Sequence, residues 1–194
     1  MKIKDFRGII FGRQAPSSTK NQKRERDPEA RSTKKGNNWH FGYKAHIGVD
    51  RDTGIVHHLK VTGANEHDSN VVADLMYGEE ETLHGDSGYL GSDKKENAIT
   101  KNKDGKKIKY IINRRSSSIR KLSKSGQYRA KKIEKAKSSV RCKVEHVFAV
   151  VKRLFKYRRT QYRDLEKQTA KLNIMFALAN LYLADSEFVK SLTV

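Results

Sequence analysis

One stretch of the sequence combines an acidic residue with cations at helical spacing. Arg141, Glu145 and Lys152 occupy positions i, i+4 and i+11, which brings their side chains to one side of an α-helix. A carboxylate flanked by two cations is suited to chemistry on phosphate groups. An intrahelical salt bridge between Arg141 and Glu145 explains the same spacing, and both interpretations stay open at this point.

A second acidic residue follows a short apolar segment. Asp86 lies between Gly85 and the dipeptide Ser87-Gly88, where a backbone can approach a ligand closely. A turn-forming aspartate also fits this setting. If Asp86 and Glu145 meet, their oxygens are the hard ligands that Mg²⁺ or Mn²⁺ prefers. Two such ions about 3.5–4 Å apart can activate a water or a 3′-hydroxyl for phosphoryl transfer.

The positive charge of the chain is concentrated in one third of its length. The formal net charge is +20; residues 101–163 hold 23 Lys+Arg against three acidic residues, and the remainder carries 19 of each sign. Residues 108–137 are rich in Ser, Lys and Arg, which predicts a basic, flexible insertion that stays extended until phosphates neutralise it. A solvated loop without a partner is the alternative. The candidate contacts with nucleic-acid phosphates are Arg114, Arg115, Lys131, Lys132 and Arg153.

Composition excludes several classes of protein. The length fits one compact domain covering residues 1–194. The single cysteine, Cys142, excludes a disulfide framework and a cysteine-based zinc site. No run of about 18 apolar residues is present, so we predict a soluble, cytoplasmic protein without a membrane span.

Alternating apolar residues predict the strands that position these groups. Residues 39–50 alternate strictly, a turn follows at 50–54, and residues 55–61 resume the alternation, which predicts a β-hairpin. Shorter strands are predicted at residues 82–85 and 107–112. Strands followed by helices are typical of an α/β fold with one mixed sheet.

The remaining segments are predicted as loop or helix. Residues 13–38 are polar and hold both prolines, which predicts a loop. A helix is predicted to begin with Asp68 or Ser69 as its N-cap, because apolar residues recur behind them. From residue 138 the apolar period is helical and continues to residue 155. Residues 171–185 are apolar nearly all round, which predicts a buried helix.

Several stretches resemble the DDE-type transposases of bacterial insertion sequences, in the group that includes insertion sequences four and five. The block R-x3-E-x6-K, here Arg141, Glu145 and Lys152, is similar to the family's signature around its catalytic glutamate. The other matching stretches are APSSTKN (15–21), KKGNNWHFGYKAHIGVD (34–50), VTGANEHD (61–68), GDSGYLG (85–91) and LANLYLAD (178–185).

The resemblance implies a fold, a site and partners. The fold would be RNase H-like, a mixed sheet flanked by helices, with the basic insertion before the glutamate-bearing helix. Asp86 and Glu145 would be the second and third catalytic carboxylates and metal ligands, supported by Arg141 and Lys152 as contacts to DNA phosphates. The cofactor would be Mg²⁺ or Mn²⁺, and the partner double-stranded DNA at transposon ends and targets. Whether the chain forms a homo-oligomer stays open.

The sequence departs from the family where the first catalytic aspartate belongs. Ungapped alignment places Ile9 there, and Asp5, the nearest acid, lies four residues earlier. With the family's N-terminal DNA-recognition domain also absent from the sequence, we expect a truncated transposase with impaired activity. A non-catalytic DNA-binding remnant or regulator is the alternative. A basic RNA-associated protein also fits the charge but leaves GDSGY and the Arg-Glu-Lys helix unexplained.

Overall fold

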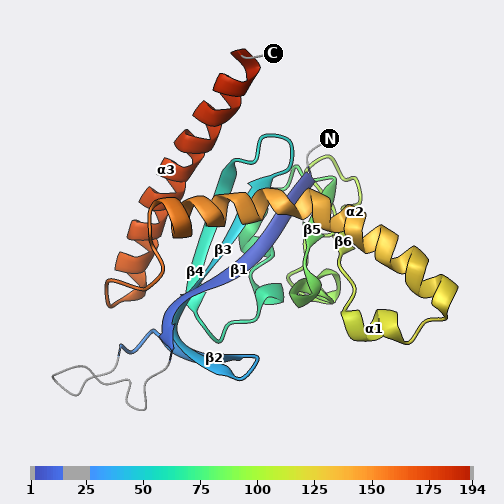
Figure 1. Cartoon of the computed structure of the whole chain (residues 1–194), viewed down its shortest axis with the longest axis horizontal. Coiled ribbons are helices and arrows are strands. Elements are labelled where there is room, and N and C mark those ends of the chain that lie inside the picture. The colour runs from blue at the N-terminus through green and yellow to red at the C-terminus, as the bar shows by residue number, and fades with distance from the viewer. Residues whose placement is uncertain (1–2, 15–26, 193–194) are drawn as a thin grey trace.

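The computed structural model describes the backbone of residues 3–14 and 27–192, and the side chains of residues 27–185. One six-stranded mixed sheet forms the centre (Figure 1). Its strands are β1 (Ile3–Gln14), β2 (Arg31–Lys35), β3 (Asn38–Asp50), β4 (Val56–Gly63), β5 (Thr82–Gly85) and β6 (Lys109–Ile112).

The strand β1 lies in the middle of the sheet and has one antiparallel and one parallel neighbour. It pairs antiparallel with β3 on one side and parallel with β5 on the other. The strand β6 extends the sheet parallel to β5, and β4 extends it antiparallel to β3. The predicted strands at residues 39–50, 55–61, 82–85 and 107–112 are therefore confirmed within a few residues.

The tight turn between β3 and β4 is fixed by one carboxylate. Asp50 Oδ1 accepts hydrogen bonds from the backbone N–H groups of Asp52 (3.0 Å) and Thr53 (2.9 Å). Gly54 closes the turn at φ +72°, which a side chain would strain. The register of the hairpin follows from this turn.

The loop predicted for residues 13–38 is wrong in part. Residues 31–35 form β2, which pairs with β3, and residues 13–14 complete β1; residues 15–26 lie outside the described residues. The strand β2 carries no apolar alternation because it is polar and mostly exposed on both faces. Backbone hydrogen bonds to β3, and not burial, define it.

The helices are α1 (Ser116–Arg120), α2 (Lys124–Ala149) and α3 (Leu165–Leu192), with a π-helical segment η5 (Val150–Leu154) directly after α2. The extended insertion predicted for residues 108–137 is wrong, because this segment forms β6, α1 and the first half of α2. The side chain of Ser123 caps α2 by accepting from Gly126 N–H. Lysine, arginine and alanine have high helix propensity, so α2 forms here without a continuous apolar face.

The helix predicted after Asp68 is replaced by two 3₁₀ turns, η1 (Asp68–Asn70) and η2 (Ala73–Leu75). The His67 side chain accepts from Ser69 N–H and caps η1. Two further 3₁₀ turns follow β5, namely η3 (Ser87–Tyr89) and η4 (Ser92–Lys94). The apolar residues that indicated a helix are buried all the same, in a small core with β5.

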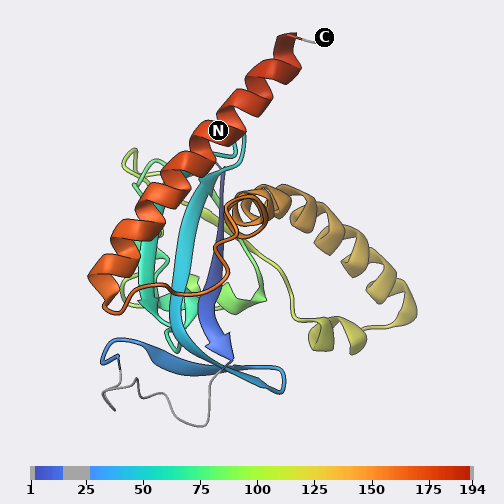
Figure 2. The same ribbon diagram turned by 60° about the vertical axis from the view of Figure 1, so that its left-hand side comes forward.

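The main core lies between the sheet and two helices. Both α2 and α3 pack on the face of β3 that carries Ala45 and Ile47 (Figure 2). Phe148 of α2 and Phe176 of α3 meet edge to face, with ring centroids 5.7 Å apart. Nearby, the buried Tyr157 hydroxyl donates to Gln168 Oε1 at 2.7 Å.

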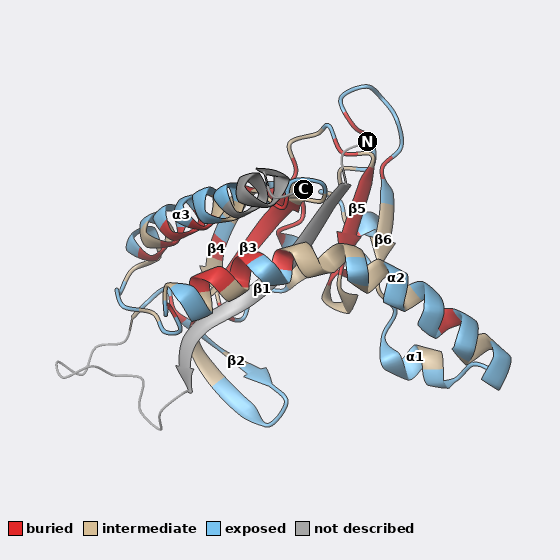
Figure 3. Ribbon diagram, turned by 45° about the horizontal axis from the view of Figure 1, so that its top comes forward, coloured by how far each residue is buried: buried red, intermediate tan, exposed pale blue. Residues whose placement is uncertain are grey.

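The helix α3 is not buried all round as predicted. Leu172, Met175, Phe176 and Ala179 are buried, whereas the opposite side of the helix is exposed (Figure 3). The apolar composition of α3 therefore exceeds what its contact with the sheet requires. None of the helices in the described part of the chain is both long and apolar enough to span a membrane.

Candidate active site

Asp86 is positioned at the end of β5, where the chain turns into η3. Its Oδ1 accepts from Gly88 N–H at 2.8 Å, and its backbone carbonyl accepts from Tyr89 N–H at 3.1 Å. These bonds hold the carboxylate at the edge of the sheet, as an N-cap does at the start of a helix. The side chain keeps 31% of its surface exposed.

The helix α2 brings two further predicted residues to the same place. Arg141 lies on the side of α2 that faces β5, and its Nη1 is 3.7 Å from Asp86 Oδ2. Its Nη2 is 3.8 Å from Glu145 Oε1, one helical turn away. One guanidinium therefore lies between two carboxylates that are 59 residues apart in the sequence. The Arg141–Glu145 salt bridge is present, and it is part of a larger cluster.

The cluster has the chemistry of a cation site. Asp86 and Glu145 present carboxylate oxygens, which are the ligands that Mg²⁺ prefers, and both already face one positive charge. Glu145 is 48% exposed, so the cluster opens to solvent on one side. Among the described residues, no group of three or more His, Cys, Asp or Glu side chains is arranged to hold a metal ion. Asp86 and Glu145 are of the residue type that holds such an ion, and in this structure the guanidinium of Arg141 lies between them.

A polar network that sequence reasoning left without a role adjoins Asp86. The carboxylate of Asp68 pairs with Lys44 Nζ at 3.1 Å and lies 3.6 Å from His46 Nδ1. A Cβ on Gly88 would lie 2.9 Å from Asp86 Oδ1 and 3.0 Å from Asp68 Oδ2. The two carboxylates therefore come close together only because position 88 has no side chain.

His46 is buried in that network and is uncharged at neutral pH. Its Nε2 lies 3.0 Å from Thr62 Oγ1, which itself donates to the Gly63 carbonyl. Burial, and secondarily the positive charge of Lys44, lowers the pKa of His46 to about 3. The contact between His46 and Asp68 is therefore not an ion pair at neutral pH. The only signal for His46 and Asp68 in the sequence is that they lie in two of the stretches that resemble the family, residues 34–50 and 61–68.

The strand β1 passes beside Asp86. Phe6 pairs with Gly85, the residue before Asp86, and the strand continues through Ile9, whose backbone pairs with Ala45. The side chains of Asp5 and Ile9 lie outside the described side chains. The backbone of the segment expected to carry a first aspartate thus lies next to the cluster.

Lys152 does not follow the regular helical geometry assumed from the sequence. It lies half-buried in η5, where the wider π-helical turn changes its angular position relative to Glu145. Arg153, the next residue, is exposed. The structure brings Arg141 and Glu145 together as predicted, and the part of Lys152 in the cluster stays a prediction.

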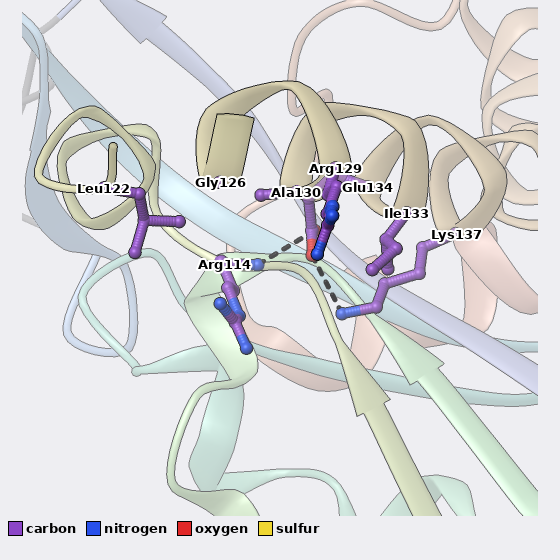
Figure 4. Close-up of a pocket in the computed structure, with 8 residues that line it drawn as sticks. All are labelled: Arg114, Leu122, Gly126, Arg129, Ala130, Ile133, Glu134 and Lys137. Atoms are coloured by element: carbon purple, nitrogen blue, oxygen red, sulfur yellow. Dashed lines mark hydrogen bonds and ion pairs between the residues drawn. The ribbon is translucent and has the colours of Figure 1, made fainter. Parts of the chain in front are cut away.

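The other predicted basic residues lie on α2 and on the segment before α1. Arg114, Arg115, Lys131 and Lys132 are all exposed. Arg114 also lines a hollow of about 200 Å³ between α2 and the segments that precede it, together with Arg129 and Lys137 (Figure 4). Glu134 organises this hollow, because it accepts from Arg114 N–H at 3.0 Å and pairs with Lys137 Nζ at 2.9 Å.

Comparison with models of known protein families shows the family of the chain. The model of the transposase DDE domain matches residues 13–181. The chain belongs to this family of transposases. No solved structure matches the chain.

Proposed function

We propose that this transposase domain carries out metal-dependent cleavage and strand transfer of DNA at the ends of an insertion sequence, with activity weakened by the loss of one metal ligand. The observation that carries the proposal is the convergence of Asp86 and Glu145 on the guanidinium of Arg141. The same proposal places the protein on chromosomal DNA in the nucleoid.

The strand order supports an RNase H-like arrangement. A central β1 lies between antiparallel β3 and parallel β5, with β4 and β6 outside them. Because β1 and β5 are parallel neighbours, their carboxyl ends meet at the same edge of the sheet. This arrangement brings the end of β5 beside β1 and beneath α2, where Asp86 from the end of β5 and Glu145 from α2 would share one site.

Each residue of the cluster has a distinct part in the proposed reaction. The carboxylates of Asp86 and Glu145 would hold the divalent ion, Mg²⁺ or Mn²⁺. When bound, this ion activates the attacking hydroxyl and stabilises the leaving oxygen of the phosphodiester. Arg141 would balance the negative charge of the carboxylates and contact a DNA phosphate, since a guanidinium fits both groups. Lys152 and Arg153 would contact phosphates further along the backbone.

The weakened activity follows from the ligand count. By the resemblance noted in the sequence, Ile9 stands where the first aspartate of the family is expected, and a hydrocarbon side chain supplies no ligand oxygen. Metal ions contribute several kcal/mol to such reactions, and each 1.36 kcal/mol corresponds to a factor of ten in rate. We therefore expect cleavage at least about a hundredfold slower than in a complete site.

DNA binding is proposed to depend on the exposed cations of α2, of η5 and of the segment before α1. Lys and Arg side chains at phosphates release condensed counterions, and this release makes the affinity strongly dependent on salt. The proposed contacts are Arg114, Arg115, Lys131, Lys132 and Arg153, all of them exposed.

The proposal is tested by incubating the full chain with DNA carrying insertion-sequence ends, with Mg²⁺ or Mn²⁺ and with EDTA. We expect DNA binding in all three conditions, and weak nicking only with metal, lost in Asp86→Asn and in Glu145→Gln. Asp93→Asn, an exposed acid in η4, is the matched control and should retain the nicking. Nicking that persists in EDTA or in Asp86→Asn would contradict the proposed site. Robust cleavage by the natural chain would contradict the proposed weakening.

A second function, that of a DNA-binding regulator without catalysis, is favoured by one observation. The described side chains offer no set of three metal ligands, while the basic residues of α2 remain exposed. In that case DNA binding would depend on salt but would be indifferent to metal, and no nicking would be found at any metal concentration.

A further inference from the structure

The outer face of α3 carries an apolar stripe with no partner among the described residues. Ile174 is 59% exposed and Leu181 is 68% exposed, although both are aliphatic. The exposed members of the stripe are Ile174, Ala177, Leu178, Leu181 and Tyr182. Their spacing of three, one, three and one residues follows the helical repeat, so they form one continuous face. Exposed apolar faces of this kind mark sites of protein association.

The stripe is bounded by opposite charges at equal distances from its centre. Lys171 lies seven residues before Leu178 and is partly buried; Asp185 lies seven residues after it and is exposed. If two copies of α3 pack antiparallel with Leu178 at the two-fold axis, Lys171 of each copy lies level with Asp185 of the other. Ile174 then lies level with Tyr182. A parallel pair would instead place like charges side by side.

We infer that two copies of this chain associate through the outer faces of their α3 helices, packed antiparallel and centred on Leu178. A two-fold interface requires a surface that is complementary to itself, and the stripe with its terminal charges meets this condition. The geometry also permits the contact, because the second half of α3 extends beyond the sheet in both ribbon views (Figures 1 and 2). A nucleic acid is a poor occupant of this stripe, which presents aliphatic side chains where the outer face of α2 presents lysines.

Sedimentation equilibrium of the full chain tests the inference through a charge exchange. The natural chain should be a dimer, and Lys171→Glu or Asp185→Lys alone should weaken dimerisation by about tenfold, because each creates two like-charge contacts. The double variant Lys171→Glu/Asp185→Lys should restore the natural affinity. Lys135→Glu, which makes the same charge change on α2, should leave dimerisation unchanged.

Leu178→Glu should weaken dimerisation by at least about a hundredfold, because it would bury two carboxylates at the axis. Circular dichroism and the thermal midpoint of each variant establish that it is folded. In a Cys142→Ala background, Leu178→Cys should oxidise to a disulfide-linked dimer, since residue 178 meets itself at the axis. A natural chain that is monomeric at all concentrations overturns the inference. So does a dimer that is indifferent to Leu178→Glu, or one that the double charge exchange fails to restore.

Discussion

The helices α2 and α3 cover the same face of the sheet, but the surfaces that they turn to solvent are opposite in character. Their inner faces are alike, since Phe148 of α2 and Phe176 of α3 pack together in one core. Outward, α2 presents Lys131 and Lys132, whereas α3 presents Leu178. The inner faces therefore explain the fold, and the outer faces indicate two kinds of partner, a polyanion for α2 and a second protein surface for α3.

The largest expected effect concerns the shared inner faces. Phe148→Ala should lower the free energy of unfolding by about 3–5 kcal/mol, because it leaves a cavity between α2 and α3. Leu181→Ala on the outer face of α3 should change it by less than about 0.5 kcal/mol when the chain is monomeric. Urea titration of both variants at low protein concentration measures the difference. Equal losses would show that the outer face of α3 is packed within the monomer.

The next effect comes from the far side of β3, where His46 is buried among polar groups. Its pKa of about 3 in the folded chain lies below its ordinary value of 6.5, so below pH 6.5 the unfolded chain binds a proton that the folded chain does not. Stability is therefore lost as the pH falls from about 6.5 towards 3, by up to about 1.4 kcal/mol per pH unit from this residue. His46→Gln should flatten that dependence in urea titrations at several pH values. An unchanged slope would show that His46 is accessible to protons in the folded chain.

The smallest effect tests the outer face of α2. Lys131→Ala/Lys132→Ala should reduce the slope of log affinity for DNA against log salt concentration by up to about 1.8, if both lysines contact phosphates. The matched pair Lys34→Ala/Lys35→Ala, also exposed but on β2, should change the slope less. Fluorescence anisotropy with labelled duplex DNA at four salt concentrations measures it. A larger change in this slope for the β2 variant would indicate that DNA binds at the other end of the sheet.

Much of the fold could be predicted because burial leaves a period in the sequence. The hairpin of β3 and β4 was predictable from alternation, since one face of β3 packs under the helices. The strand β2 and the first half of α2 left no such period, because neither buries a continuous apolar face. Residues 171–185 of α3 were predicted to be buried nearly all round, but composition does not tell an inner apolar face from an outer one.

The candidate site was predictable only where residue type and spacing were unusual. Asp86 was predictable because it is flanked by glycines, and Glu145 because it lies among cations. The structure places Arg141 between the two carboxylates. The network of Lys44, His46 and Asp68 depends on the packing of η1 against β3, which no local pattern contains. Its proximity to Asp86 follows from the space at Gly88 and could not be predicted from the sequence.

The most direct test of the account is to return the absent carboxylate to β1. Ile9→Asp should raise metal-dependent cleavage of insertion-sequence-end DNA by at least about a hundredfold over the natural chain, and Ile9→Asp/Asp86→Asn should abolish that gain. Ile9→Asn, which is similar in size and adds no charge, should give no comparable gain. If Ile9→Asp folds and binds DNA but cleaves no faster than the natural chain, then Asp86 and Glu145 are not two parts of an incomplete metal site.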